Sequence, residues 1–137
     1  MKHLVNPLQS GDIGFVFHKR KFWGFLESPD PKIDFGFIFI GLGKCAVVEK
    51  GKLSVKDLDS YSNRKVVFKR REELSNSDRS RLLWYIQSYG LNKQKVPNNA
   101  EFISTCFDYI CKPLQQNENS PGSFESLFNS KRIFEVK

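Results

Sequence analysis

Short apolar segments separated by turn residues occupy the first half of this chain. They are rich in aromatic and β-branched side chains, and one of them, Phe-Gly-Phe-Ile-Phe-Ile-Gly, has almost no polar position, which is typical of a strand covered on both faces. Because several of the links between the segments are of hairpin length, we expect antiparallel pairing. The predicted strands are residues 13–17, 35–41, 45–49 and 65–69, with an edge strand at residues 132–136.

A capping box marks the start of the first main helix. Ser75 is followed three residues later by Asp78, so each side chain can accept a hydrogen bond from the other residue's backbone N–H. Gly90 is suited to end the helix. The apolar residues between these signals fall on one helical face, which predicts a helix packed against a sheet. They are Leu82, Leu83, Ile86 and Tyr89.

A second helical repeat begins at Asn98 or Asn99 and stops at Pro113. Its apolar positions are Ile103, Cys106, Phe107 and Ile110. Two short helical pieces are also expected, one turn within residues 53–61 and a short helix around residues 124–128. The order of elements predicts an α+β fold in a single domain of residues 1–137, with an antiparallel sheet of about five strands packed against two main helices.

Composition narrows the classes of protein that this chain can belong to. The cysteines Cys45, Cys106 and Cys111 are odd in number and form no Cys-x-x-Cys pair, which favours a reducing compartment over a disulfide framework or a zinc site. No segment approaches the roughly 18 apolar residues of a membrane span, and residues 1–7 lack an apolar signal region. We therefore expect a cytoplasmic or virion-associated protein with no signal peptide, no membrane span, no cofactor and no metal.

The net charge of +7 raises the question of an anionic partner. The basic run Lys19, Arg20 and Lys21 is followed directly by Phe22 and Trp23. Such a segment can bind single-stranded nucleic acid through charge and base stacking. Aromatic and basic side chains also anchor protein interfaces. A protein partner is expected first, with nucleic acid or another anionic polymer as the alternative, and a solvated loop as the plain interpretation.

Two stretches resemble a known family. Gly-Asp-Ile-Gly-Phe-Val at residues 11–16 resembles the opening strand of circularly permuted, NlpC-type, papain-like cysteine hydrolases. Asn-Asn-Ala-Glu-Phe-Ile-Ser at residues 98–104 is similar to the Asn-Cys-x-(Glu/Asp)-Phe-Val pattern around the nucleophile in some members. The resemblance covers residues 11–111, mostly in the order and spacing of elements, and implies a permuted NlpC/papain-like fold.

The resemblance also implies where an active site would lie. The nucleophile position holds Asn99, or Ser104 if a competing Cys-Ser-Glu-Leu-Val register applies, and the general-base position at the second strand holds Phe35. We prefer Asn99, because it follows Pro97 at a helix start, where the helix dipole lowers the pKa of a thiol. A thiol hydrolase needs a thiolate paired with a base, and neither an amide nor a phenyl ring meets that need. The implied site is therefore inactive.

Three functions follow from these residues. The first is a catalytically inactive NlpC/papain-like domain that serves as a protein-binding or structural module, by analogy in a phage particle. The second is an active thiol peptidase or amidase that uses Cys106 as nucleophile with His18 or His3 as base, although the spacing of Cys106 also suits core packing. The third is a basic nucleic-acid-binding module centred on Lys19, Arg20 and Lys21.

Overall fold

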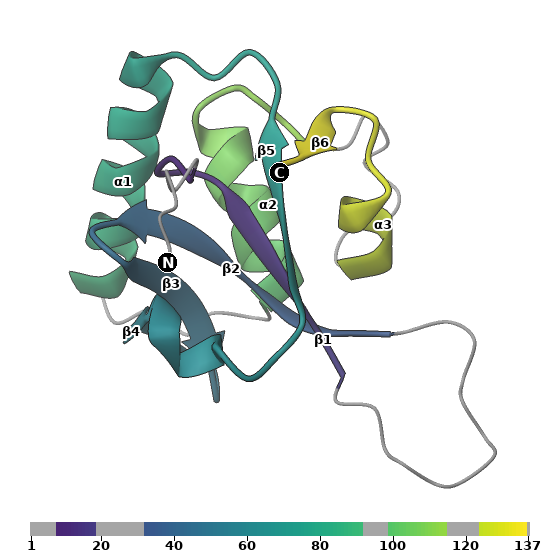
Figure 1. Ribbon diagram of the computed structural model, residues 1–137. Coiled ribbons are helices and arrows are strands. Elements are labelled where there is room, and N and C mark those ends of the chain that lie inside the picture. Colours follow the sequence, from purple (N-terminus) through teal and green to yellow (C-terminus); the bar gives the residue numbers. More distant parts are fainter. Residues whose placement is uncertain (1–7, 19–31, 92–98, 115–123, 137) are drawn as a thin grey trace, which may run out of the picture.

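A six-stranded antiparallel sheet forms the centre of the molecule (Figure 1). The computed structural model describes residues 8–18, 32–91, 99–114 and 124–136. Every neighbouring pair of strands in the sheet is antiparallel, so the predicted α+β class and sheet type are confirmed, with six strands in place of about five. The strands lie in the order β4-β3-β2-β1-β5-β6, with bounds β1 (Ile13–Phe17), β2 (Ile33–Gly41), β3 (Lys44–Glu49), β4 (Lys52–Asp57), β5 (Val66–Arg71) and β6 (Ile133–Glu135).

The additional strand is β4, in the region where a single helical turn was expected. A two-residue turn at Lys50 and Gly51, both with positive φ (52° and 76°), folds β4 back on β3 and pairs Glu49 with Lys52. The expectation of a helical turn over residues 53–61 is therefore wrong for the first part of that segment. It holds for the second part, where the 3-10 helix η1 (Leu58–Tyr61) follows the strand.

The helices cover one face of the sheet. They are α1 (Asn76–Leu91), α2 (Asn99–Tyr109) and the short α3 (Phe124–Phe128), and their buried side chains share one core cluster with Ile13, Phe15 and Phe17 of β1. Because side chains alternate along a strand, Val16 points to the opposite, outer face. There it packs in a smaller cluster with Phe37, Cys45 and Val47, against which Leu58 and Tyr61 also pack.

A glycine opposite a phenylalanine allows the outer cluster to close over the centre of the sheet. Gly14 of β1 pairs with Phe37 of β2, and the Phe37 ring lies over the glycine. A Cβ atom at position 14 would come within 2.3 Å of the Phe37 ring, which is far inside contact distance. The ring can therefore be fully buried only because residue 14 has no side chain.

The capping box at the start of α1 is present as predicted. The Ser75 backbone N–H donates to the Asp78 carboxylate (3.1 Å), and the Asp78 N–H donates to the Ser75 hydroxyl oxygen (3.0 Å). The hydrogen bond from the Ser75 N–H holds the pKa of the Asp78 carboxyl below its usual value, because it stabilises the charged form. Leu82 and Ile86 are buried, and the helix continues one residue past Gly90.

The second main helix ends in a left-handed residue. Cys111 has a φ of 59°, and the backbone N–H groups of Cys111 and Lys112 donate to the carbonyl oxygens of Asp108 and Phe107. This is the pattern of a Schellman motif, with a cysteine at the position that glycine usually occupies. The helix therefore stops several residues before Pro113.

Candidate functional site

Both residues proposed for the former nucleophile position belong to α2. Asn99 is the first residue of the helix, in agreement with the expected helix start. Ser104 lies half-buried within the helix, away from the N-terminal N–H groups that would activate a nucleophile. Pro97, which was expected to introduce this helix, lies outside the described residues.

Cys106, the alternative nucleophile, lies in the core on the inner side of α2. Its exposed fraction is 0%, and it packs in the main cluster among buried residues of α2 and the sheet. Burial raises the pKa of the Cys106 thiol far above its usual value, because the charged thiolate loses its hydration there. A thiol that stays protonated at neutral pH and has no contact with solvent is poorly suited to nucleophilic attack.

His18, the proposed base, lies just past the end of β1 with its side chain 55% exposed. Its Nδ1 atom is 3.8 Å from Asp34 Oδ1, and the other Asp34 oxygen accepts a hydrogen bond from Arg64 Nη2 at 2.8 Å. His18 therefore faces a carboxylate that is already bound by an arginine. The structure does not bring this exposed histidine together with the buried Cys106, and His3 lies outside the described residues.

Phe35, the residue at the proposed base position, lies on the outer face of the sheet. Its ring packs edge-on against Tyr61, and the Arg64 guanidinium lies 5.9 Å from the ring centre. The helix α2 packs on the opposite face, where the neighbouring residue of β2, Gly36, approaches Ile103. Phe35 and α2 are thus separated by the sheet itself.

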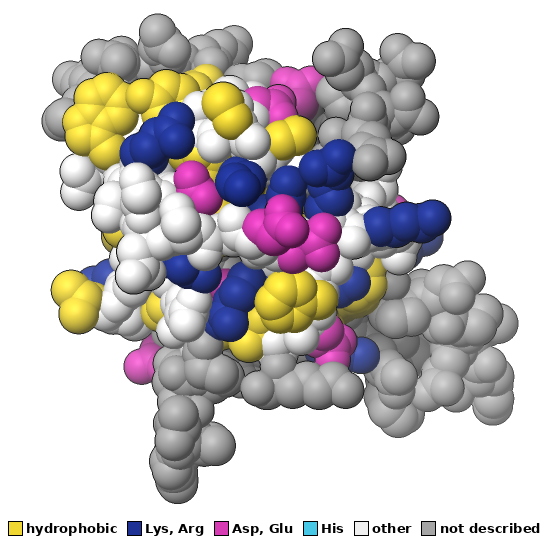
Figure 2. All heavy atoms as spheres, turned by 90° about the horizontal axis from the view of Figure 1, so that it is seen from above, with side chains coloured by type: hydrophobic (Ala, Val, Ile, Leu, Met, Phe, Trp, Pro, Cys, Tyr) yellow, Lys and Arg dark blue, Asp and Glu magenta, His cyan; other side chains and the backbone are white. Residues whose placement is uncertain are grey.

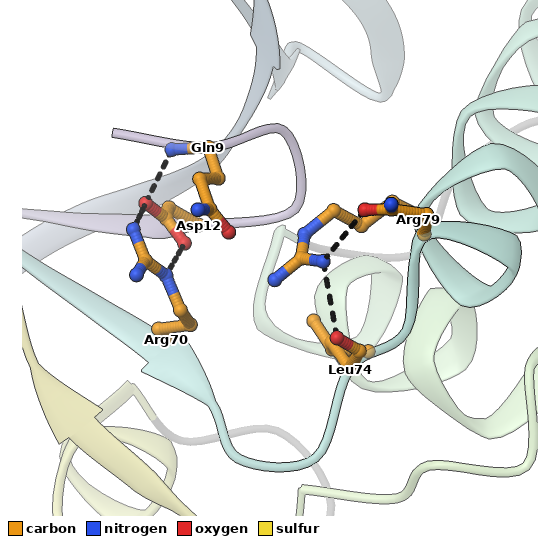
Figure 3. Close-up of polar contacts among 6 residues, drawn as sticks. Gln9, Asp12, Arg70, Leu74 and Arg79 are labelled. Carbon is orange, nitrogen blue, oxygen red and sulfur yellow. Dashed lines mark hydrogen bonds and ion pairs between the residues drawn. The ribbon is translucent and has the colours of Figure 1, made fainter. Parts of the chain in front are cut away.

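Asp12, the residue just before β1, is buried and forms an ion pair with Arg70. Figure 3 shows the Asp12 and Arg70 side chains pointing toward one another. Arg70 donates from Nε at 2.7 Å and from Nη2 at 2.8 Å, and the Gln9 backbone N–H donates to Asp12 as well. This carboxylate joins the start of β1 to the end of β5, which is a structural role.

Many of the described cations are engaged within the protein. Arg64 and Arg71 donate to backbone carbonyl groups, and so do Lys69 and Arg79 (Figure 3). Seen from above, Lys and Arg side chains lie among Asp and Glu side chains on the visible face (Figure 2). The ion pairs include Arg70–Asp12, Arg64–Asp34, Lys44–Asp57 and Lys56–Glu49. The predicted binding residues Lys19, Arg20, Lys21, Phe22 and Trp23 lie outside the described residues.

A group of aromatic side chains lies where α1 and α2 run side by side. The Tyr85 and Tyr109 rings stack at 4.2 Å between centroids, and Trp84 stacks on Tyr109 at 6.2 Å. Trp84 is 59% exposed and Tyr109 is 42% exposed, although both are large apolar residues. We call Trp84, Tyr85, Tyr109 and the adjacent Arg81 the α1–α2 aromatic surface.

The sequence of α1 contains a local signal for this surface. Residues 82–89 carry no charge, although 27% of the chain is charged. A helix with one buried face normally carries charged residues on the other. An uncharged helical segment that exposes Trp84 is typical of the centre of a protein interface, where charges are depleted and aromatic residues enriched.

We also searched the described part of the chain for a metal site and for a membrane-spanning helix. No group of three or more His, Cys, Asp or Glu side chains with the arrangement of a metal site occurs among residues 8–18, 32–91, 99–114 and 124–136. None of the described helices is long and apolar enough to cross a membrane. Comparisons with protein-family models, with curated proteins and with solved structures find no match to this chain.

Proposed function

We propose that this chain is a non-catalytic protein-binding module, built on the plan of the permuted NlpC/papain-like hydrolases, which binds through the α1–α2 aromatic surface. The observation that carries the proposal is the exposure of Trp84 and Tyr109 on a helix pair whose α1 side is uncharged over residues 82–89. Trp, Tyr and Arg are the residue types that contribute most binding energy in protein interfaces. Arg81 supplies the third of these types, one helical turn from Trp84.

The state of the thiols supports a module without thiol chemistry. Cys106 is buried with a raised pKa, and His18 faces Asp34 at the end of β1. Thiol catalysis needs a thiolate and a base within hydrogen-bond reach of each other. All three cysteines are unpaired, which suits a module that works in the cytoplasm or in a virion assembled there.

Protein is favoured over nucleic acid as the partner because several arginines are already bound by groups within the protein. Binding of nucleic acid depends on cations that are available to neutralise phosphates. Here Arg64 and Arg70 are held by carboxylates, and Arg71 donates to the carbonyl oxygens of Glu72 and Pro113. The outer side of α2 adds an exposed carboxylate, Asp108, next to Tyr109.

A thiol-labelling experiment at neutral pH tests the non-catalytic half of the proposal. We expect a small alkylating reagent to modify the exposed Cys111 quickly and to leave Cys106 unmodified until the protein unfolds. Peptide mass spectrometry reads both sites in the same molecule, so Cys111 is an internal control for reagent activity. Fast labelling of Cys106, together with peptide or amide hydrolysis that Cys106→Ser abolishes, would show an active hydrolase and overturn the proposal.

A further inference from the structure

The strand β4 lies at one edge of the sheet and turns backbone groups away from it (Figure 1). The Leu58 N–H donates to the Gly43 carbonyl oxygen, just past the end of the β3–β4 ladder. In an antiparallel ladder every second residue bonds to the neighbouring strand, so the even-numbered residues of β4 bond to β3. The N–H and C=O groups of Leu53, Val55 and Asp57 therefore point outward.

This edge is open within the described part of the chain. No other described segment forms a hydrogen bond with the outward backbone groups of β4. Leu53 is half-buried on the helix side of the sheet, where it packs against the main core cluster, and Val55 on the same side is 59% exposed. The opposite edge strand, β6, has only three residues, against six in β4. An open edge of this length is a template for pairing with another extended chain.

Positive charge gathers where the β3–β4 hairpin turns. The hairpin carries four lysines and two carboxylates. Both carboxylates form ion pairs with lysines of the hairpin, and Glu49 lies 3.0 Å from Lys56 in one of them. Lys50 and Lys52 are exposed and form no ion pair with a described carboxylate. Asp59 is exposed at the other end of β4, in η1, so the positive charge is confined to the turn end.

These features suit one kind of occupant. We propose that β4 binds an extended acidic segment of another protein, which adds to the sheet as a further strand. The segment bonds to the outward backbone groups, and apolar side chains at alternate positions cover Leu53 and Val55 on the helix side. Acidic side chains at one end of the segment pair with Lys50 and Lys52. This site is additional to the α1–α2 aromatic surface and uses the sheet edge in place of helix side chains.

A second copy of β4 fits the edge less well. Two-fold antiparallel pairing keeps the faces of the two sheets aligned, so outward-facing residues must stand opposite one another. With Leu53 opposite Val55 of the copy, Lys52 stands opposite Lys56 of the copy. With Val55 opposite Val55 of the copy, Leu53 stands opposite Asp57 of the copy. The first register opposes like charges, and the second sets an apolar side chain against a carboxylate.

Amide hydrogen exchange of the full chain with a synthetic peptide tests the site. The probe is the blocked peptide Thr-Val-Thr-Val-Glu-Val-Glu, whose acidic end lies beside the turn when the peptide runs antiparallel to β4. In the free chain the amides of Leu53, Val55 and Asp57 should exchange quickly, and those of the even-numbered residues of β4 slowly. The peptide should slow exchange of the outward amides by about tenfold or more. A peptide with Lys in place of Glu is the control and should bind more weakly.

Two variants separate backbone pairing from charge. Val55→Pro removes an outward N–H but no bond to β3, and should weaken peptide binding by about tenfold. Lys52→Glu should weaken it by about three- to tenfold, because the peptide carboxylates then meet a like charge. Lys131→Glu makes the same change beside β6, at the opposite edge of the sheet, and should leave binding unchanged. Circular dichroism verifies that each variant is folded.

A modified peptide gives the backbone test on the wild-type chain. The valines of the bound peptide face the helix side, and their N–H groups point to β4, so N-methylation of the valines should abolish binding. The proposal is wrong if the acidic peptide protects none of the outward amides, if the lysine peptide protects them equally, or if N-methylation has no effect. Outward amides that are already protected in the free chain would also overturn it. Such protection rising with protein concentration would identify a second copy as the occupant.

Discussion

The two main helices differ in which of their side chains reach solvent. The helix α2 buries Phe102, Ile103 and Phe107 at 1% exposure or less, and it places Cys106 among them. Among the side chains of α1 up to Tyr89, only those of Leu82 and Ile86 are buried to a comparable degree, and Trp84 is exposed. The helix α2, whose sequence resembles a nucleophile motif, therefore serves mainly as part of the core. The helix α1, which was predicted only to pack against the sheet, exposes the aromatic surface.

The largest expected effect is a loss of stability when a buried aromatic ring of α2 is removed, compared with removal of an exposed ring of α1. Phe107→Ala should lower the free energy of unfolding by about 3–5 kcal/mol, because the ring is fully buried and its removal leaves a cavity. Trp84→Ser should lower it by about 1 kcal/mol or less, since only its stacking on Tyr109 is lost. Urea unfolding of both variants measures the difference. Equal losses would mean that Trp84 also belongs to the core.

The buried thiols make stability depend on alkaline pH. Burial raises the pKa of Cys45 from about 9.0 to about 11, and raises the pKa of Cys106 further. The unfolded chain releases these protons as pH passes 9 while the folded chain keeps them, so the free energy of unfolding should fall between pH 9 and 11 by about 1–3 kcal/mol.

Two variants test whether this pH dependence of stability comes from the buried Cys106. Cys106→Ala should flatten the decline seen in urea unfolding at successive pH values, even though it lowers stability overall. Trp84→Ser, which changes only the exposed side of α1, should keep the wild-type slope. A Cys106→Ala profile parallel to that of the wild type would indicate that Cys106 is not protected in the way its burial implies.

The capping box gives a smaller and more local effect on α1. Ser75→Ala removes the hydroxyl that accepts the Asp78 N–H and should cost about 1 kcal/mol of stability. Ser77→Ala, at an equally exposed serine two residues further on, is the control and should change stability little. Thermal unfolding of the two variants checks the difference. A larger loss for Ser77→Ala would contradict the assignment of Ser75 as the cap.

The smallest expected effect is a gain in stability at the end of α2. Cys111 has a left-handed backbone, which glycine adopts without a steric penalty, so Cys111→Gly should stabilise the protein by about 0.5–1 kcal/mol. Cys111→Ala, which keeps a Cβ atom in the same conformation, should not give this gain. A destabilised Cys111→Gly variant would show that the Cys111 side chain makes a contribution of its own.

The sequence predicted those elements whose signals are local. The capping box of Ser75 and Asp78, the apolar run of β2 and the helical repeat of α2 each appear where they were expected. β4 was missed because Leu53, Val55 and Leu58 fit a helical turn as well as a strand, and only pairing with β3 decides between the two.

The candidate site was harder to predict, because it depends on which face of an element is covered. Nothing local to Phe35 shows that it faces away from α2, since that depends on the side of the sheet on which the helix packs. The apolar face predicted for α1 leaves Trp84 outside, as the structure does, but a single exposed apolar residue does not by itself indicate an interface. The uncharged run over residues 82–89 was the available signal.

The fluorescence of Trp84 tests most directly the central claim, that α1 presents an exposed aromatic surface suited to binding. The variant Trp23→Phe leaves Trp84 as the only tryptophan, since the chain has two. At low protein concentration its emission should be that of a solvent-exposed indole. Iodide, a quencher that stays in water, should reduce this emission strongly, because Trp84 is 59% exposed. Emission at the shorter wavelength of a buried indole, with little quenching by iodide, would contradict the exposed aromatic surface.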